Sequence, residues 1–168
     1  MATVATSSQK AKVALPADEQ ILITREFDAP RELVYKAWTT PELVKRWWHA
    51  NRGELTVAEI DLRVGGSWRY VMTACGGFEV GFHGEFREIV PNERLVSTEV
   101  WEGDESGYPT EPALNTTSFT EVEGRTTLTL LVEAPSKEIR DAIIASGMED
   151  GLQDALDLLE QVAISLVR

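Results

Sequence analysis

The histidine and carboxylates around position 84 are the residues of this sequence whose types and spacing most directly suggest chemistry. His83 and Glu85 are two positions apart, so both lie on one face if the segment is a β-strand. An imidazole beside a carboxylate can act as an acid–base pair. Because Glu79 and Arg87 share that face, we favour a solvent-exposed cluster of cross-strand charges instead.

Metal binding and nucleophilic catalysis have little support. The H-x-E spacing at His83 occurs in zinc deaminases, but no P-C-x-x-C follows and Cys75 is the only cysteine. Cys75 precedes Gly76-Gly77 and has no adjacent basic residue that would activate its thiol. The sequence also lacks the nucleophile-elbow, phosphate-loop and dinucleotide-binding patterns. We therefore predict no metal site and no cofactor.

The segment 94–102 offers a second polar arrangement. Leu95, Ser97, Glu99 and Trp101 share one face of the predicted strand. If that face is inward, Ser97 and Glu99 lie inside the protein, where a carboxyl group can have a raised pKa or orient a ligand. If the opposite face is inward, both are merely solvated. The alternation leaves both interpretations open.

Composition limits the function classes. With 168 residues, 43% of them hydrophobic, one domain with one core is expected. The net charge of −12 disfavours nucleic acid and anionic membrane as partners, since both attract clustered Lys and Arg. One cysteine allows no internal disulfide, and the sequence has neither an apolar run long enough to span a bilayer nor a recognisable secretory signal. We expect a cytoplasmic protein.

Alternating apolar residues and turn dipeptides predict the sheet that positions these side chains. We predict seven strands, at 19–28, 54–62, 67–74, 79–90, 94–102, 116–123 and 125–133. Gly65-Gly66, Gly76-Gly77, Pro91-Asn92 and Glu123-Gly124 supply tight turns between them, and 103–115 is a longer surface loop. Pro30 and Pro41 each suit the first position of a short helix after the first strand. Residues 1–17 have no periodicity and are predicted to be a mobile tail.

The end of the chain predicts a long amphipathic helix. Ser146 and Glu149 have the spacing of a capping box, which would start this helix at Ser146. One face is apolar: Met148, Leu152, Ala155, Leu156, Leu159, Val162, Ala163 and Leu166. The opposite face is polar: Glu149, Asp150, Gln153, Asp154, Asp157, Glu160 and Gln161. The polar face is predicted to be solvated.

These elements together predict an α+β fold. A curved seven-stranded antiparallel sheet would have two short helices after its first strand and the long C-terminal helix packed across its concave face. Residues 18–168 would form a single domain after the tail. A long helix bridging a curved sheet tends to leave space for a ligand between them, with mostly apolar walls.

The order of elements resembles the helix-grip fold of the START-like, or SRPBCC, superfamily, which includes the birch-pollen-allergen (Bet v 1-like) proteins and polyketide cyclases. Several local motifs are similar to the branch named after the activator of the heat-shock-protein-90 ATPase. They include Phe27-Asp28-Ala29-Pro30, Arg46-Trp47-Trp48, Asp61-Leu62-Arg63-Val64-Gly65-Gly66, Glu93-Arg94-Leu95 and Ser146-Gly147-Met148-Glu149-Asp150-Gly151. The resemblance covers residues 19–167.

What the resemblance implies is a fold and a cavity more than a reaction. Related proteins bind apolar small molecules between sheet and helix. The co-chaperone that gives the branch its name has a second, amino-terminal domain for which 168 residues leave no room, so chaperone contact is implied only weakly. Members often carry an aromatic residue after the glycine equivalent to Gly151, whereas this chain has Leu152, which implies a larger cavity.

We therefore expect a non-enzymatic binding module for a small apolar or amphipathic molecule. The expected ligand-binding residues are Trp48, Trp68, Tyr70, Met72, Phe78, Phe82, Phe86, Trp101, Met148 and Leu152. For any one of them, a plain core role is the simpler interpretation. One alternative is a cyclase- or hydrolase-like enzyme, with His49, Glu99, Asp61 and Arg63 as weak catalytic candidates. The other is a chaperone-accessory or protein-interaction module, which could form a homodimer through an exposed apolar patch.

Overall fold

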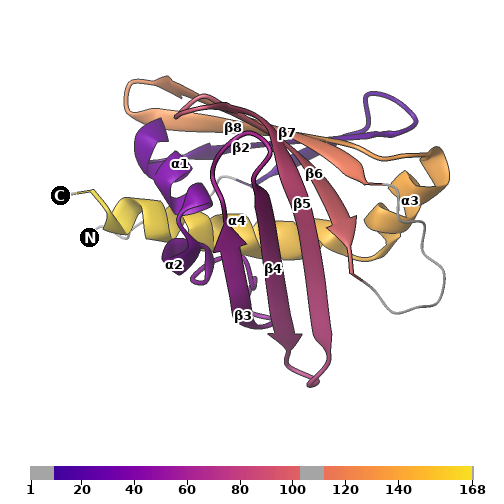
Figure 1. Ribbon diagram of the computed structural model, residues 1–168. Coiled ribbons are helices and arrows are strands. Elements are labelled where there is room, and N and C mark those ends of the chain that lie inside the picture. Colours follow the sequence, from indigo (N-terminus) through magenta and orange to yellow (C-terminus); the bar gives the residue numbers. More distant parts are fainter. Residues whose placement is uncertain (1–9, 103–111, 168) are drawn as a thin grey trace.

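Eight antiparallel strands form one sheet in this computed structural model, which describes residues 10–102 and 112–167 (Figure 1). The strands are β1 (Lys12–Ala14), β2 (Gln20–Phe27), β3 (Gly53–Ile60), β4 (Ser67–Ala74), β5 (Glu79–Val90), β6 (Arg94–Trp101), β7 (Ala113–Val122) and β8 (Arg125–Glu133). The helices of this part of the chain are α1 (Arg31–Thr39), α2 (Pro41–Val44), α3 (Lys137–Ala145) and α4 (Met148–Ser165). The α+β class is as predicted.

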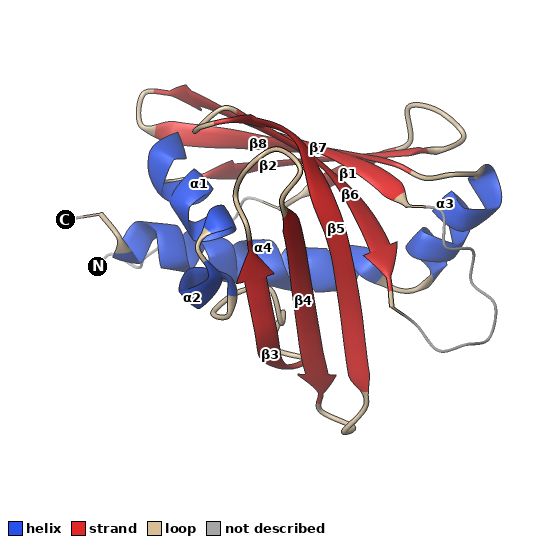
Figure 2. Ribbon diagram, in the orientation of Figure 1, coloured by secondary structure: helices blue, strands red, loops and turns tan. Residues whose placement is uncertain are grey.

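Short turns explain the order of strands in the sheet, which is β1-β2-β8-β7-β6-β5-β4-β3 (Figure 2). From β4 to β8 each strand pairs with the one before it, and β2 pairs with both β8 and β1. Gly65, Gly77 and Gly124 have φ values of 85°, 90° and 79°, a region that favours glycine, and each lies in a predicted turn. The predicted loop 103–115 lies largely outside the described residues, and β7 begins at Ala113.

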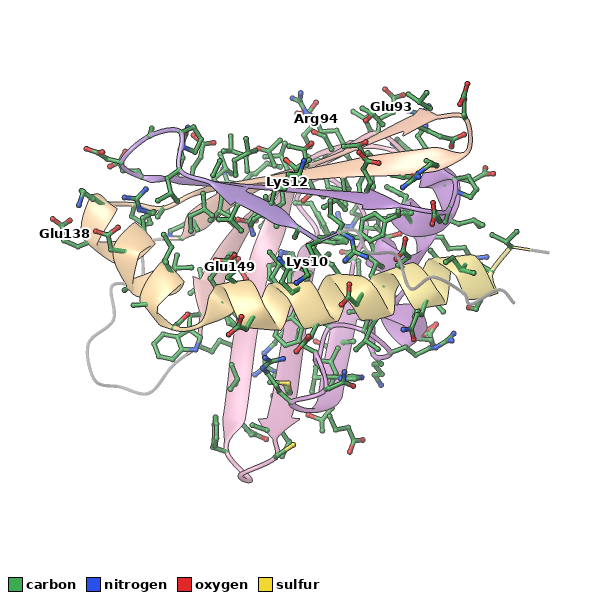
Figure 3. The ribbon with its side chains drawn as sticks, turned by 180° about the vertical axis from the view of Figure 1, so that it is seen from behind. Lys10, Lys12, Glu93, Arg94, Glu138 and Glu149 are labelled. Carbon is green, nitrogen blue, oxygen red and sulfur yellow. The ribbon has the colours of Figure 1, made fainter. Side chains whose placement is uncertain are left out.

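The sheet has eight strands rather than the seven predicted, because β1 lies within the expected tail. Val13 pairs with Ile23 of β2. Just before β1, the Ala11 N–H donates to Gln153 Oε1 of α4 at 3.0 Å, and Gln153 Nε2 donates to the Ala11 carbonyl at 2.8 Å. Figure 3, seen from behind, shows Lys10, the neighbour of Ala11, beside α4. The side-chain amide thus holds this segment as a neighbouring strand would.

The long helix begins later than predicted, and the capping box is wrong. The cap residue of α4 is Gly147, whose φ is 84°, and no side chain caps the helix. Ser146 instead ends α3: its N–H donates to the Ala142 carbonyl at 3.0 Å, and its hydroxyl donates to the Ile143 carbonyl. Since that N–H is already used by α3, it is not available to Glu149. The side-chain cap in this region belongs to Ser136, which accepts from Ile139 N at 3.2 Å and starts α3.

The core lies between the sheet and α4, which runs across one face of the sheet (Figure 1). Leu156, Leu159 and Ala163 of the helix are fully buried with residues of β2 and β8 such as Ile23 and Leu128. Helix α1 packs against α4 and against strands β7 and β8, and it contributes Val34 and Ala37 to the same core. The apolar face of α4 is therefore buried as predicted.

The polar face of α4 is less solvated than predicted. Arg25 of β2 is fully buried, and its guanidinium donates to Asp157 Oδ1 at 2.8 Å and to Glu160 Oε1 at 3.0 Å. Glu160 is only 5% exposed and also accepts the Asp28 N–H at 2.9 Å. At the surface, Arg52 pairs with Asp154 at 2.8 Å. Charged side chains thus join this face of the helix to the sheet and to the turn before β3.

Candidate functional site

Strand β6 directs the face that carries Glu99 toward the core, which decides between the two interpretations of segment 94–102. Leu95 is buried in the core, and Glu99 lies on the same face. Glu99 Oε1 accepts a hydrogen bond from Asn115 Nδ2 of β7 at 2.8 Å. We refer to Glu99 and Asn115 as the polar pair.

The Glu99 carboxyl is desolvated, although the residue as a whole is not fully buried. Burial raises its pKa above the ordinary glutamate range, and the hydrogen bond from Asn115 opposes that rise only in part. The residue as a whole is nevertheless half-buried rather than fully buried. Among the described residues it forms no ion pair with a basic side chain.

Asn115 has a hydrogen-bonding capacity that the protein leaves unused. Its Oδ1 atom is buried and finds no hydrogen-bond donor among residues 10–102 and 112–167. Buried polar atoms are nearly always hydrogen-bonded, and leaving one without a partner costs about 1–3 kcal/mol. An unpartnered acceptor beside a desolvated carboxyl is therefore an unusual feature for a plain core.

Four aromatic rings lie on the same side of the sheet, which we call the aromatic cluster: Trp48, Trp68, Tyr70 and Phe82. Trp48, in the turns after α2, has its ring centroid 5.5 Å from Tyr70 and 5.6 Å from Phe82. Trp68 and Tyr70 of β4 lie 4.9 Å apart. Tyr70 pairs with Phe82 of β5. Apart from Trp68, these rings remain partly accessible.

The aromatic cluster adjoins the polar pair. Phe82 pairs with Trp101 of β6, which stands two residues from Glu99 on the same face. The pKa of Tyr70 is raised, first by burial and then by the negative charge of Glu99. The phenol and the carboxyl therefore share one poorly solvated environment.

Gly84 allows Trp68 to take its place in the cluster. The indole Nε1 of Trp68 donates to the Thr98 carbonyl of β6 at 3.2 Å, so the ring passes over β5. A Cβ atom at Gly84 would lie 2.6 Å from that nitrogen and would collide with the Thr98 carbonyl oxygen. Gly84 is therefore the residue that leaves room for the Trp68 ring and the Thr98 carbonyl.

The other expected ligand-binding residues are spread between core and surface. Phe86 is buried, and Met72 of β4 pairs with Val80 of β5. Met148 and Leu152 of α4 are partly buried against the core. Phe78, on the β4–β5 turn, is 63% exposed, and Trp101, at the end of β6, is 42% exposed. The structure brings together four of the ten residues as the aromatic cluster.

Of the weak catalytic candidates, Glu99 is the one on the core face of the sheet. Asp61 and Arg63 pair with each other at 2.8 Å in the exposed β3–β4 turn. His49 Nδ1 accepts the Asn51 N–H at 2.9 Å, which supports the turn that leads into β3.

His83 lies on the outer face of the sheet, as the charge-cluster interpretation predicts. Its partner is Glu102 rather than Glu85: His83 Nδ1 lies 2.7 Å from Glu102 Oε2. Arg69 donates to Glu102 Oε1 at 2.9 Å, and this hydrogen bond is the main reason that the pKa of Glu102 is lowered. No cluster of His, Cys, Asp and Glu in the described part of the chain could hold a metal ion.

Asn115 is the site residue that sequence reasoning missed. The predicted strand began at Thr116, one residue too late to include it, whereas β7 begins at Ala113. A signal was present, because Asn115 falls on the face of β7 that also carries the buried Thr117 and Phe119. An amide at such an apolar, alternating position indicates a buried polar group that needs partners.

Comparison with known proteins identifies the family. The profile described as activator of Hsp90 ATPase homolog 1-like protein matches residues 28–163. A crystal structure of a Rhodobacter sphaeroides protein is similar, with 27% identity, a TM-score of 0.85, and coverage of 94% of this chain and 99% of that chain. A Chromobacterium violaceum protein has 27% identity and a TM-score of 0.76, with 88% and 98% covered.

A Mycobacterium smegmatis protein with 24% identity, a TM-score of 0.79, and coverage of 90% and 94% shares the fold. Among curated proteins, none matches this chain significantly. None of the helices that the structure describes is long and apolar enough to cross a bilayer. The family profile spans most of the sequence, and the chain therefore belongs to the activator of Hsp90 ATPase homolog 1-like family within the START-like superfamily.

Proposed function

We propose that this chain is a non-enzymatic module that binds a small apolar or amphipathic molecule between its sheet and helix α4, as in a helix grip. The observation that carries the proposal is the state of Glu99, which is desolvated enough to have a raised pKa but keeps accessible surface. A residue in a fully packed core would have no such surface, and a carboxyl on the outside would not be desolvated. The cytoplasmic location expected from composition stays a prediction.

The aromatic cluster supports the same proposal. Trp48, Tyr70 and Phe82 stand on the core side of the sheet but keep part of their surface accessible. Ligand sites of soluble proteins are typically lined by such rings together with a few polar groups that orient the ligand. In this proposal the cluster forms the wall, and Glu99 with Asn115 forms the polar end.

Acid–base catalysis on the bound molecule is a second candidate function, because Glu99 lies beside other polar groups. A carboxyl with a raised pKa can both donate and accept a proton near neutral pH. Such an activity would convert the ligand to a product of different mass or structure, and Glu99→Gln would abolish the conversion while leaving binding detectable. Incubation with the co-purified ligand followed by mass spectrometry distinguishes catalysis from binding.

A chaperone-accessory function, which the family description suggests, has less support. Exposed large apolar residues among those described come from six separate segments of the chain: Leu15 after β1, Leu62 and Val64 before β4, Phe78 before β5, Trp101 at the end of β6, Val122 at the end of β7, and Ile164 and Val167 at the end of α4 and just beyond it. A protein-docking surface would instead gather such residues into one patch.

Native mass spectrometry of the purified protein, compared with the denatured mass, tests the binding proposal. We expect a non-covalent species that is lost on denaturation. Trp48→Ala should weaken its retention, whereas Phe78→Ala, the same type of change at an exposed ring on a turn, should not. A protein with no bound species that also fails to bind an apolar naphthalene dye would contradict the proposal, as would equal effects of the two substitutions.

A further inference from the structure

We propose that the ligand of this site carries a cationic nitrogen, which is held by oxygen atoms of Glu99 and Asn115 and faces the rings of the aromatic cluster. This inference rests on the proposed binding function and names the chemical class of the ligand.

The polar pair presents acceptors and lacks a donor for a ligand. An ionised carboxylate accepts hydrogen bonds only, and Asn115 already directs its Nδ2 group to Glu99 at 2.8 Å. What remains is Asn115 Oδ1, which has no donor among the described residues, and the free capacity of the Glu99 carboxylate. Two acceptors from adjacent strands require a ligand with N–H or O–H donors. A protonated amine supplies up to three.

The charge of Glu99 also has no counter-ion from the described part of the protein. The nearest hydrogen-bonding partner is a neutral amide, and burial disfavours the ionised form. Burial therefore favours the protonated form of the carboxyl when no ligand is bound. A cationic ligand would take over that role and displace the proton.

The aromatic cluster favours the same charge. The faces of Trp, Tyr and Phe rings carry partial negative charge and attract cations, most strongly for Trp. Trp48 stands within 5.6 Å of both Tyr70 and Phe82, so several rings converge on a small region. A carboxylate ligand such as a fatty acid would instead meet these faces and Glu99 with unfavourable charge.

A head-group series tests the inference. Isothermal titration calorimetry near neutral pH would compare 2-naphthylmethylamine, 2-naphthylmethanol and 2-naphthoate, which share one ring system and differ in charge. We expect the amine to bind about 10-fold or more tightly than the alcohol, since a hydrogen bond to a charged group is the stronger kind. The naphthoate should bind most weakly.

Two variants with the same charge change separate the site from the overall charge of −12. Glu99→Gln should remove the preference for the amine, whereas Glu59→Gln, at an exposed position of β3, should leave it intact. Thermal unfolding of both variants checks that each is folded.

Each outcome decides between the two proposals. Equal binding of the three probes, tighter binding of naphthoate, or an amine preference that survives Glu99→Gln would overturn the cationic ligand but leave the binding module standing. If none of the three probes binds and native mass spectrometry finds no ligand, both proposals fail. Preference for the amine that depends on Glu99 and not on Glu59 supports both.

Discussion

Arg25→Met should destabilise the protein far more than the loss of a surface ion pair would. Arg25 lies on the buried face of β2, with its guanidinium over the Phe27 ring and bonded to two carboxylates of α4. Methionine fills a similar volume, so the main effect of the substitution is the loss of the positive charge and its hydrogen bonds. Of the two carboxylates, Asp157 is 54% exposed and returns to water, whereas Glu160 is left buried.

The magnitude follows from the position of Glu160. Breaking a buried ion pair by removing one partner costs about 3–5 kcal/mol, because the other charge stays without compensation. Glu160 keeps the Asp28 N–H at 2.9 Å, so we expect the lower half of that range. The matched control is Arg52→Met, which breaks a pair whose side chains are 45% and 47% exposed and should cost about 0–1 kcal/mol.

Urea unfolding followed by tryptophan fluorescence measures both free energies of unfolding. Adding Glu160→Gln to Arg25→Met should recover at least about half of the loss, because the glutamine carries no charge and still accepts from Asp28. If Arg25→Met costs no more than Arg52→Met, or if the second substitution recovers nothing, then Glu160 is not left as an uncompensated buried charge.

Three further predictions concern glycine sterics, pH and helix capping. Gly84→Ala should cost about 1–3 kcal/mol or more, because the added Cβ would collide with the Thr98 backbone. Gly151→Ala should stabilise the protein by about 1 kcal/mol, because Gly151 lies in α4 with open space around it. Urea unfolding midpoints compare the two variants, and equal effects would contradict this steric account. Since the folded-state pKa of Glu99 lies above its unfolded value, the folded state binds the extra proton and stability falls as pH rises through the interval between the two values. Glu99→Gln should therefore be more stable than the wild type above that interval and lose the advantage below it, and thermal unfolding across pH that shows no such trend would argue against a desolvated carboxyl. Ser136→Ala should cost about 1 kcal/mol by removing the N-cap of α3, and Ser146→Ala should cost nearly nothing. If unfolding experiments gave the reverse order, Ser146 would cap α4 as the sequence predicted.

Most of the sheet was predictable because its signals are local. Strands β4, β5 and β8 have the bounds that alternation and turn dipeptides predict. The aromatic cluster was predictable in part, because Trp68, Tyr70 and Phe82 fall on apolar faces of their strands by simple alternation. Trp48 joins them through the turns after α2, a placement that periodicity along the chain could not give.

The remainder depends on contacts between distant residues. Ile21, Ile23 and Phe27 mark one face of β2, and Arg25 falls on that face, yet its partner Glu160 is 135 residues away. The inward face of β6 was ambiguous because both faces of that strand mix apolar with polar residues. It was decided by pairing with β7 across the connection 102–112, which no local pattern encodes.

The short strand β1 determines where this chain can be shortened. A protein that began at residue 18, the boundary suggested by composition, would lack both β1 and the contact of Ala11 with α4. The backbone of β2 at positions 22–24 would then be an open edge, and open edges recruit strands from other copies and promote aggregation. The intact chain ends its sheet instead with a three-residue strand bearing the exposed Lys12, and a short, charged edge strand discourages further pairing. The N-terminal segment is therefore expected to protect the β2 edge from pairing with strands of other copies.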